Sequence, residues 1–172
     1  MATEIILLRL VHILSGIFWV GTALFTAFYL LPAMASAGPA AGPVMASFQR
    51  RKLYTVLPLM ALLTMLSGAR LMQIVSGGFQ PAYFRSLSGR TFAVAAVAAI
   101  IAFIVSLAVA RPAALRAGAL GAQLAETQDQ AARATLMTQL EGARKKSAIG
   151  TLAAVALLVI AAGGMAIARY LG

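Results

Sequence analysis

Long stretches without a charged residue dominate the chain. They cover residues 10–49, 53–69, 91–110 and 147–168. A helix needs about 20 mainly apolar residues to cross roughly 30 Å of hydrocarbon, so each stretch is long enough, or nearly long enough, to span a membrane. The pattern predicts an all-α fold, an integral membrane four-helix bundle.

Proline and glycine set the ends of the predicted helices. Pro32 and the segment 38–43, with its two Gly-Pro-type breaks, end the first helix, and we expect a loop to follow. Gly77 and Gly78 end the second helix. The third begins with Ser88 as its candidate N-cap and ends before the Arg111-Pro112 pair. The predicted spans are residues 6–31, 53–76, 91–110 and 149–170.

The segment between the third and fourth spans, residues 111–146, is rich in Ala, Leu, Gln and Glu. It predicts extensions of both flanking helices that turn near residues 128–130 and form an antiparallel helical hairpin. Two solvated extensions without a partner are the alternative. We find no internal repeat, so the chain is interpreted as one transmembrane bundle domain over residues 1–172. The apolar contacts of the hairpin would come from Leu115, Leu120, Leu124, Leu136 and Leu140.

Lysine and arginine are distributed unequally between the two predicted sides of the membrane. Residues 50–52 and the hairpin together carry nine of them, and the opposite side carries four. Cytoplasmic loops are enriched in these residues, so we expect the hairpin in the cytoplasm and both termini outside, in a cell's inner (plasma) membrane. Glu4 precedes an apolar run far longer than a signal peptide's core of about 7–15 residues, so this run is expected to remain as the first span. The four basic residues on the side opposite the hairpin are Arg9, Arg85, Arg90 and Arg169.

Composition narrows the possible chemistry. Of the 172 residues 62% are apolar and 10% charged, which excludes a water-soluble globular domain. The net charge of +10 would suggest a nucleic-acid partner in a soluble protein, but here it follows from topology, so the expected partner is the lipid bilayer and not nucleic acid. The absence of cysteine excludes disulfides, thiolate metal sites and iron–sulfur clusters. One histidine and four acidic residues leave no two-histidine site within one chain and no carboxylate dyad in a span.

The single histidine, His12, lies about one and a half turns into the first predicted span. Arg70 is the one basic residue inside the second span, and an antiparallel helix pair would bring it to a similar depth. Arg9 precedes His12 by one turn. Ionisable residues within a span are functional candidates by default. Imidazole is an axial ligand of haem iron, and guanidinium groups bind carboxylates such as the haem propionates, so these three residues predict a haem site.

Further candidates complete this site. Trp19 lies two turns from His12, where it either packs inside the bundle or contacts a ligand. A second axial ligand would come from Met65, Met72, Met165 or the His12 of a second copy in a homodimer, or the iron would be five-coordinate. The structural alternative is that His12 hydrogen-bonds a neighbouring helix, Arg70 extends toward the surface and the methionines are packing residues. Copper at His12 is a further possibility, because imidazole and thioether groups suit that metal.

The segment Leu10-Val11-His12-Ile13-Leu14-Ser15-Gly16-Ile17-Phe18-Trp19-Val20-Gly21 carries the pattern His-x6-Trp-x-Gly. It resembles the first helix of small bacterial membrane proteins of the copper-resistance-D-like group. It is also similar to the HemJ group of protoporphyrinogen oxidases, which are four-helix bundles thought to bind b-type haem. The resemblance covers residues 8–33 and extends to Ser67, Gly68 and Arg70. It implies haem binding through His12, and not the oxidase activity, because the additional histidine and lysine positions of the HemJ proteins are not recognisable in this chain.

Three functions therefore follow from the sequence as expectations. The first is binding of a tetrapyrrole, b-type haem before a chlorin, for redox chemistry or haem handling. The second is a non-enzymatic accessory or assembly subunit that docks other membrane protein subunits. The third is a copper or small-solute permease, and the sequence leaves open whether the protein is an enzyme.

Overall fold

A computed structural model of the chain describes residues 2–38 and 41–171. Helix accounts for 90% of the chain, and the described part contains no strand. Within these described residues, four helical rods are long and apolar enough to cross a membrane. The prediction of an all-α protein with four such helices is confirmed, and the chain has the architecture of a multi-pass membrane protein. The rods comprise residues 2–37, 53–75, 87–126 and 130–168.

The first rod does not stop at Pro32, as the sequence predicted. It consists of α1 (Ala2–Phe25), a π-helical turn η1 (Thr26–Leu30) and α2 (Leu31–Ala37). The Leu31 N–H donates to the Thr26 carbonyl, five residues back, which widens the helix just before the proline. Proline ordinarily breaks a helix because its ring clashes with the carbonyl four residues earlier. The wider turn relieves that clash, and the helix continues.

The third rod passes Pro112 in the same way. It consists of α5 (Leu87–Val105), the π-helical turn η4 (Ser106–Ala110) and α6 (Arg111–Glu126). The prediction of a break at Arg111-Pro112 was therefore wrong, and the third span continues directly into the helical extension predicted for residues 111–146. Residues 2–37 and 87–126 thus each form a long helix that carries a π turn directly before an X-Pro pair. The two helices share this arrangement although we found no repeat in the sequence.

The second rod is preceded by a helix that the sequence did not predict. Where we expected a loop, α3 (Ala41–Arg50) forms, with Pro43 in its first turn, where proline is tolerated. Lys52 adopts a left-handed φ of 57° and separates α3 from α4 (Leu53–Val75). The positive φ angles of Gly77 and Gly78 end that helix as predicted.

The connection from α4 to α5 is a capped turn. It contains a 3-10 helix, η3 (Tyr83–Arg85), followed by the N-cap of α5. The cap is Ser86 and not the predicted Ser88, because the Ser86 Oγ accepts a hydrogen bond of 3.0 Å from the Gly89 N–H. The same hydroxyl donates to the Tyr83 carbonyl at 2.7 Å, so one side chain fixes both the 3-10 helix and the start of α5.

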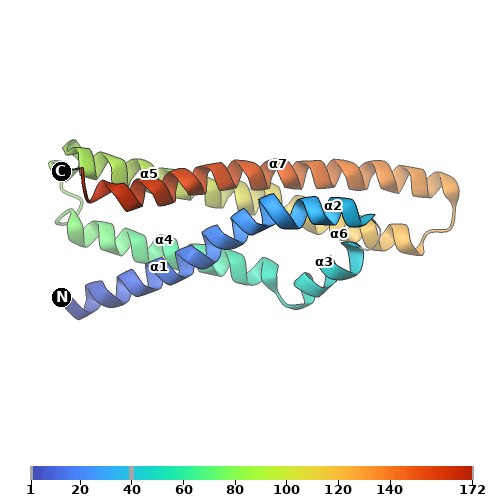
Figure 1. Ribbon diagram of the computed structural model, residues 1–172, viewed down its shortest axis with the longest axis horizontal. Helices are drawn as coiled ribbons and strands as arrows, with labels where there is room; N and C mark the ends of the chain where they lie inside the picture. The colour runs from blue at the N-terminus through green and yellow to red at the C-terminus, as the bar shows by residue number, and fades with distance from the viewer. Residues whose placement is uncertain (1, 39–40, 172) are drawn as a thin grey trace.

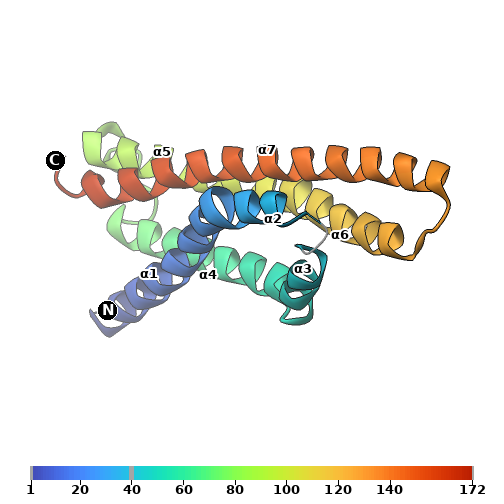
Figure 2. The same cartoon turned by 45° about the vertical axis from the view of Figure 1, so that its right-hand side comes forward.

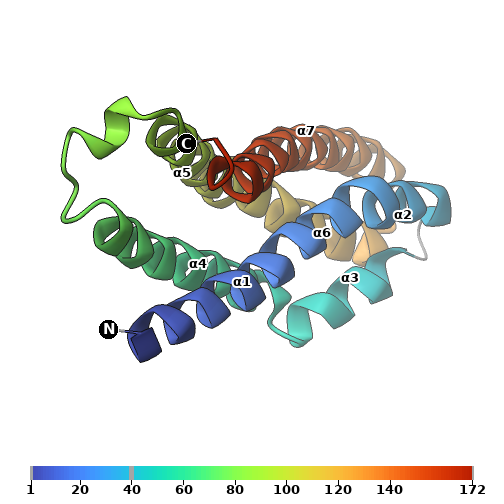
Figure 3. The same ribbon diagram turned by 60° about the vertical axis from the view of Figure 1, so that its left-hand side comes forward.

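Two antiparallel helix pairs make up the bundle. The rods that contain α1 and α4 form one pair, and α5 with α7 (Gln130–Ala168) forms the other, with both ends of the chain at one end of the molecule (Figure 1). Figure 3 shows the two pairs from that end, and Figure 2 shows the first rod crossing toward α7. The pairs meet in a core formed by one side chain from each rod, namely Trp19, Ala61, Ala102 and Leu158.

The far end of the molecule is a hairpin of α6 and the first part of α7. Leu120, Leu140 and Ala143 are buried between these two helices. Asp129 caps α7, since its carboxylate accepts from the Ala132 N–H at 2.8 Å. Arg133 donates to two carbonyls at the end of α6 and closes the turn.

Candidate functional site

His12 lies at the contact between α1 and α4. Its Nδ1 is 2.8 Å from the backbone carbonyl oxygen of Thr64. A carbonyl only accepts hydrogen bonds, so Nδ1 carries the proton, and in the neutral ring the lone pair then lies on Nε2. The contact therefore fixes both the tautomer and the orientation of the ring.

Gly68 makes this contact sterically possible. In a helix the carbonyl of residue 64 lies beneath the side chain of residue 68, and glycine leaves that carbonyl open to a second donor. A Cβ built on Gly68 would lie 2.7 Å from His12 Cε1 and 3.0 Å from Nδ1. The imidazole thus occupies the space that any other residue at position 68 would fill.

The two helices meet through matching sequence segments. Residues 12–16 read His-Ile-Leu-Ser-Gly and residues 64–68 read Thr-Met-Leu-Ser-Gly. In the antiparallel pair the first side chain of each segment lies against the glycine of the other. His12 covers Gly68, and the methyl group of Thr64 is 3.5 Å from the Cβ position of Gly16. Small residues allow this close approach of helices in a membrane.

Hydroxyl groups line the same contact. The Thr64 Oγ1 donates to the Ser15 Oγ at 2.8 Å, and the Ser15 Oγ donates to the Val11 carbonyl at 2.6 Å. The Ser67 Oγ lies 3.4 Å from His12 Nδ1 and donates to the Leu63 carbonyl. Ser15 and Ser67 are both buried, and no buried side-chain nitrogen or oxygen of the described residues lacks a partner. We call this contact, formed by residues 12–16 of α1 and 64–68 of α4, the seam. Its polar side chains are all hydrogen-bonded, and it fixes the register of α1 on α4.

The two glycines of the seam differ in the space they leave, which predicts different effects of alanine. Gly68→Ala is expected to push the imidazole off Thr64 and to destabilise the bundle by about 1–3 kcal/mol, as overpacking typically does. Gly16→Ala is the matched control, because its Cβ would make only an ordinary contact of 3.5 Å. Thermal unfolding in detergent measures both. Equal melting temperatures for the two variants would contradict the tight His12–Gly68 contact.

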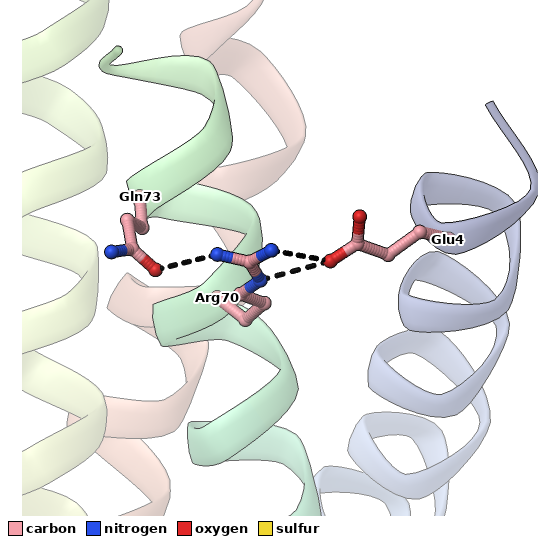
Figure 4. A network of polar contacts seen from close by, with 3 residues as sticks. All are labelled: Glu4, Arg70 and Gln73. Atoms are coloured by element: carbon pink, nitrogen blue, oxygen red, sulfur yellow. Dashed lines mark hydrogen bonds and ion pairs between the residues drawn. The ribbon is translucent and has the colours of Figure 1, made fainter. Parts of the chain in front are cut away.

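Arg70 is directed away from this seam and toward the start of α1. Its Nε and Nη2 both donate to Glu4 Oε1, at 2.9 and 2.6 Å, and its Nη1 donates to Gln73 Oε1 at 2.9 Å (Figure 4). Arg70 was expected at a similar depth to His12, and its guanidinium extends from α4 to an ion pair with Glu4, about two turns before His12. The predicted contact of Arg70 with a haem propionate stays a prediction, and the carboxylate at Arg70 in this structure is that of Glu4.

The Glu4–Arg70 ion pair is expected to contribute little to stability. Its side chains are 41% and 48% exposed, and ion pairs in such positions are worth at most about 1 kcal/mol. Glu4→Gln should therefore change the free energy of unfolding by less than about 1 kcal/mol. Titration with a denaturing detergent measures this, and a larger loss would show that the pair organises the end of the bundle.

The remaining predicted residues lie apart from one another. Arg9 is exposed, one turn before His12, and forms no ion pair with any described residue. Trp19 is 5% exposed and meets Phe103 edge-on, so it is part of the core. Met72 is half-buried on α4, one turn after Gly68. Met165 is half-buried on α7, in the other helix pair.

No group of three or more His, Asp or Glu side chains that could hold a metal ion occurs in residues 2–38 and 41–171. His12 is the one histidine of the chain. No family model, curated protein or solved structure matches the chain.

The structural alternative from the sequence was a hydrogen bond from His12 to a neighbouring helix, and the structure shows such a bond to the Thr64 carbonyl of α4. Thr64 was not among the candidates, and Ser67 and Gly68 entered only through the resemblance. The signal that would have found them is the Leu-Ser-Gly shared by residues 14–16 and 66–68, each preceded by a polar residue two positions earlier.

Proposed function

We propose that this protein binds a tetrapyrrole within the membrane, b-type haem, with Nε2 of His12 as the axial ligand. The observation that carries the proposal is the 2.8 Å hydrogen bond from His12 Nδ1 to the Thr64 carbonyl. Histidines that ligate metals almost always donate their other ring N–H to a carbonyl, a carboxylate or water, which fixes the tautomer and raises ligand basicity. His12 has this arrangement within a membrane-spanning helix.

The residues around His12 fit the charge of the proposed group. Haem carries two propionates, which need cations at the edge of the membrane. Arg9 is exposed one turn away, and no described carboxylate neutralises it. Arg70 binds the Glu4 carboxylate, so a propionate at Arg70 would take the place of Glu4. We assign the first propionate contact to Arg9.

The chain's own residues hold and orient the ligand. The Thr64 carbonyl and the space left by Gly68 fix the imidazole ring. When bound, a b-type haem supplies one-electron redox chemistry at its iron, with a potential set by the axial ligands and the surroundings. With one histidine in the chain, a second protein ligand would come from Met65, Met72, Met165 or the His12 of a second copy, or His12 would be the one protein ligand.

The proposal includes an orientation. We place residues 50–52 and 111–146 in the cytoplasm, and the seam with both termini near the opposite face of a cell's inner membrane. The nine-to-four distribution of Lys and Arg supports this orientation. His12 would then lie near the outer side, within reach of a soluble electron-transfer or haem-carrying partner.

The experiment that tests the function is the absorption spectrum of the protein extracted in mild detergent from its own membrane, before and after dithionite. We expect a Soret band, sharpened bands on reduction and about one haem per chain or per pair of chains. Red-shifted bands would indicate a chlorin on the same ligand. A folded protein without pigment that also takes up no added haemin would contradict the proposal and favour the accessory subunit.

A further inference from the structure

A groove lies at the opposite end of the membrane-spanning region from His12, between α6 and α7. It has a volume of about 360 Å³, within the range of small-ligand sites. One part of its wall is apolar, from Val109, Pro112 and Ala113. The other part carries the cations of Arg116 and Lys146, together with the amide of Gln139.

A contact between α4 and α6 shows where the groove lies along the membrane-spanning helices. Pro58 has no N–H to donate to the Tyr54 carbonyl, and Arg111 Nε fills that vacancy with a hydrogen bond of 3.1 Å. Arg111 thus lies level with the first turn of α4, where the apolar span begins. The groove starts at Val109 and continues past Arg111 to Arg116, so in a membrane it would straddle the boundary between hydrocarbon and water.

The charges in the groove are not neutralised by the chain. None of the residues lining it is acidic, and neither Arg116 nor Lys146 forms an ion pair with a described residue. Basic pockets between helices at the cytoplasmic boundary are suited to anionic lipid headgroups. Free phosphate would meet the same cations but would leave the apolar wall unused.

We propose that this groove binds one anionic phospholipid, with the phosphate between Arg116 and Lys146 and an acyl chain against Val109. The lipid would lie where the rod formed by α5 and α6 widens into η4. Gly150 of α7 packs closely there, since its Cβ position is 3.1 Å from the Ala110 nitrogen. A bound lipid would therefore brace the contact between the third and fourth rods. The inference is independent of haem binding at His12.

The test is native mass spectrometry of delipidated protein titrated with phosphatidylglycerol or with phosphatidylcholine of the same acyl chains. The double variant Arg116→Gln/Lys146→Gln is expected to bind phosphatidylglycerol about thirtyfold more weakly, since each basic residue near an anionic headgroup contributes about fivefold. The matched control Arg144→Gln/Lys145→Gln removes the same charge from residues of α7 that do not line the groove, and should change the affinity less than about twofold.

A third variant tests the shape of the groove without changing its charge. Gly142 lines the groove, and a Cβ there would meet no atom within 4 Å, so Gly142→Leu should fold and fill the groove. We expect it to lose phosphatidylglycerol while wild type retains one molecule. Equal weakening by the two double variants, full binding by Gly142→Leu, equal affinity for phosphatidylcholine, or displacement of the lipid by millimolar inorganic phosphate would each overturn the proposal.

Discussion

His12→Gln is expected to abolish haem binding while leaving the bundle folded. Glutamine retains an N–H that can donate to the Thr64 carbonyl, so the α1–α4 contact has a substitute, but it offers no imidazole nitrogen to iron. The loss should exceed the roughly 10–100-fold that removal of an outer-shell partner typically costs, because the ligand itself is removed. Titration of pigment-free protein with haemin, followed at the Soret band, measures the affinity.

The matched control for this variant is Ser67→Ala. The Ser67 Oγ is 3.4 Å from His12 Nδ1, so its removal perturbs the same seam but leaves the ligand and its bond to Thr64 in place. Its haem affinity should fall by at most about tenfold. Retention of haem by His12→Gln, with an unchanged spectrum, would show that the iron is held elsewhere.

Gly89→Ala is expected to be among the most destabilising single changes in the chain, at about 3 kcal/mol or more. A Cβ at this position would lie 2.0 Å from the Tyr83 carbonyl oxygen and 2.8 Å from the Tyr83 carbonyl carbon. Both are backbone atoms, so a rotamer change cannot relieve the clash. The capped turn of Ser86 would have to open, and the start of α5 would lose its N-cap.

Gly163→Ala serves as the control for that prediction. Gly163 lies inside α7, and a Cβ there would meet nothing within 4 Å. Alanine should be neutral or stabilising at this position by up to about 1 kcal/mol, because it is the better helix former. Thermal unfolding in detergent compares both variants with wild type, and similar melting temperatures for the two would contradict the close contact at Gly89.

The membrane-spanning helices could be predicted because charge-free length is a direct consequence of hydrocarbon thickness. The helix ends at Pro32 and Pro112 could not, because the proline rule assumes a regular α-helix. A π turn before each proline moves the carbonyl that would clash with the proline ring. The local composition of residues 26–30 does not predict this turn. The helix α3 was missed because Gly42 and Pro43 favour a turn, although both are compatible with the start of a helix.

The candidate site was predictable only in part. A single histidine in a predicted span is recognisable from the sequence as a candidate. Its partner is the backbone carbonyl of Thr64, and because every residue has a carbonyl, the sequence alone does not indicate which one it is. Only the absence of a side chain at Gly68 singles this one out. The ion pair of Arg70 with Glu4 was not predicted, because the two residues are 66 positions apart in the sequence. Which residues meet across the antiparallel pair depends on register, which the matching Leu-Ser-Gly segments set.

The most direct test of iron ligation by His12 uses the fact that the chain contains a single histidine. Protein produced with nitrogen-15 histidine and loaded with ferric haem carries the label at this one side chain. Pulsed electron paramagnetic resonance should then detect a nitrogen-15 coupling to the iron, absent from the unlabelled protein. Haem that binds without any nitrogen-15 coupling would contradict the assignment of His12 Nε2 as the axial ligand.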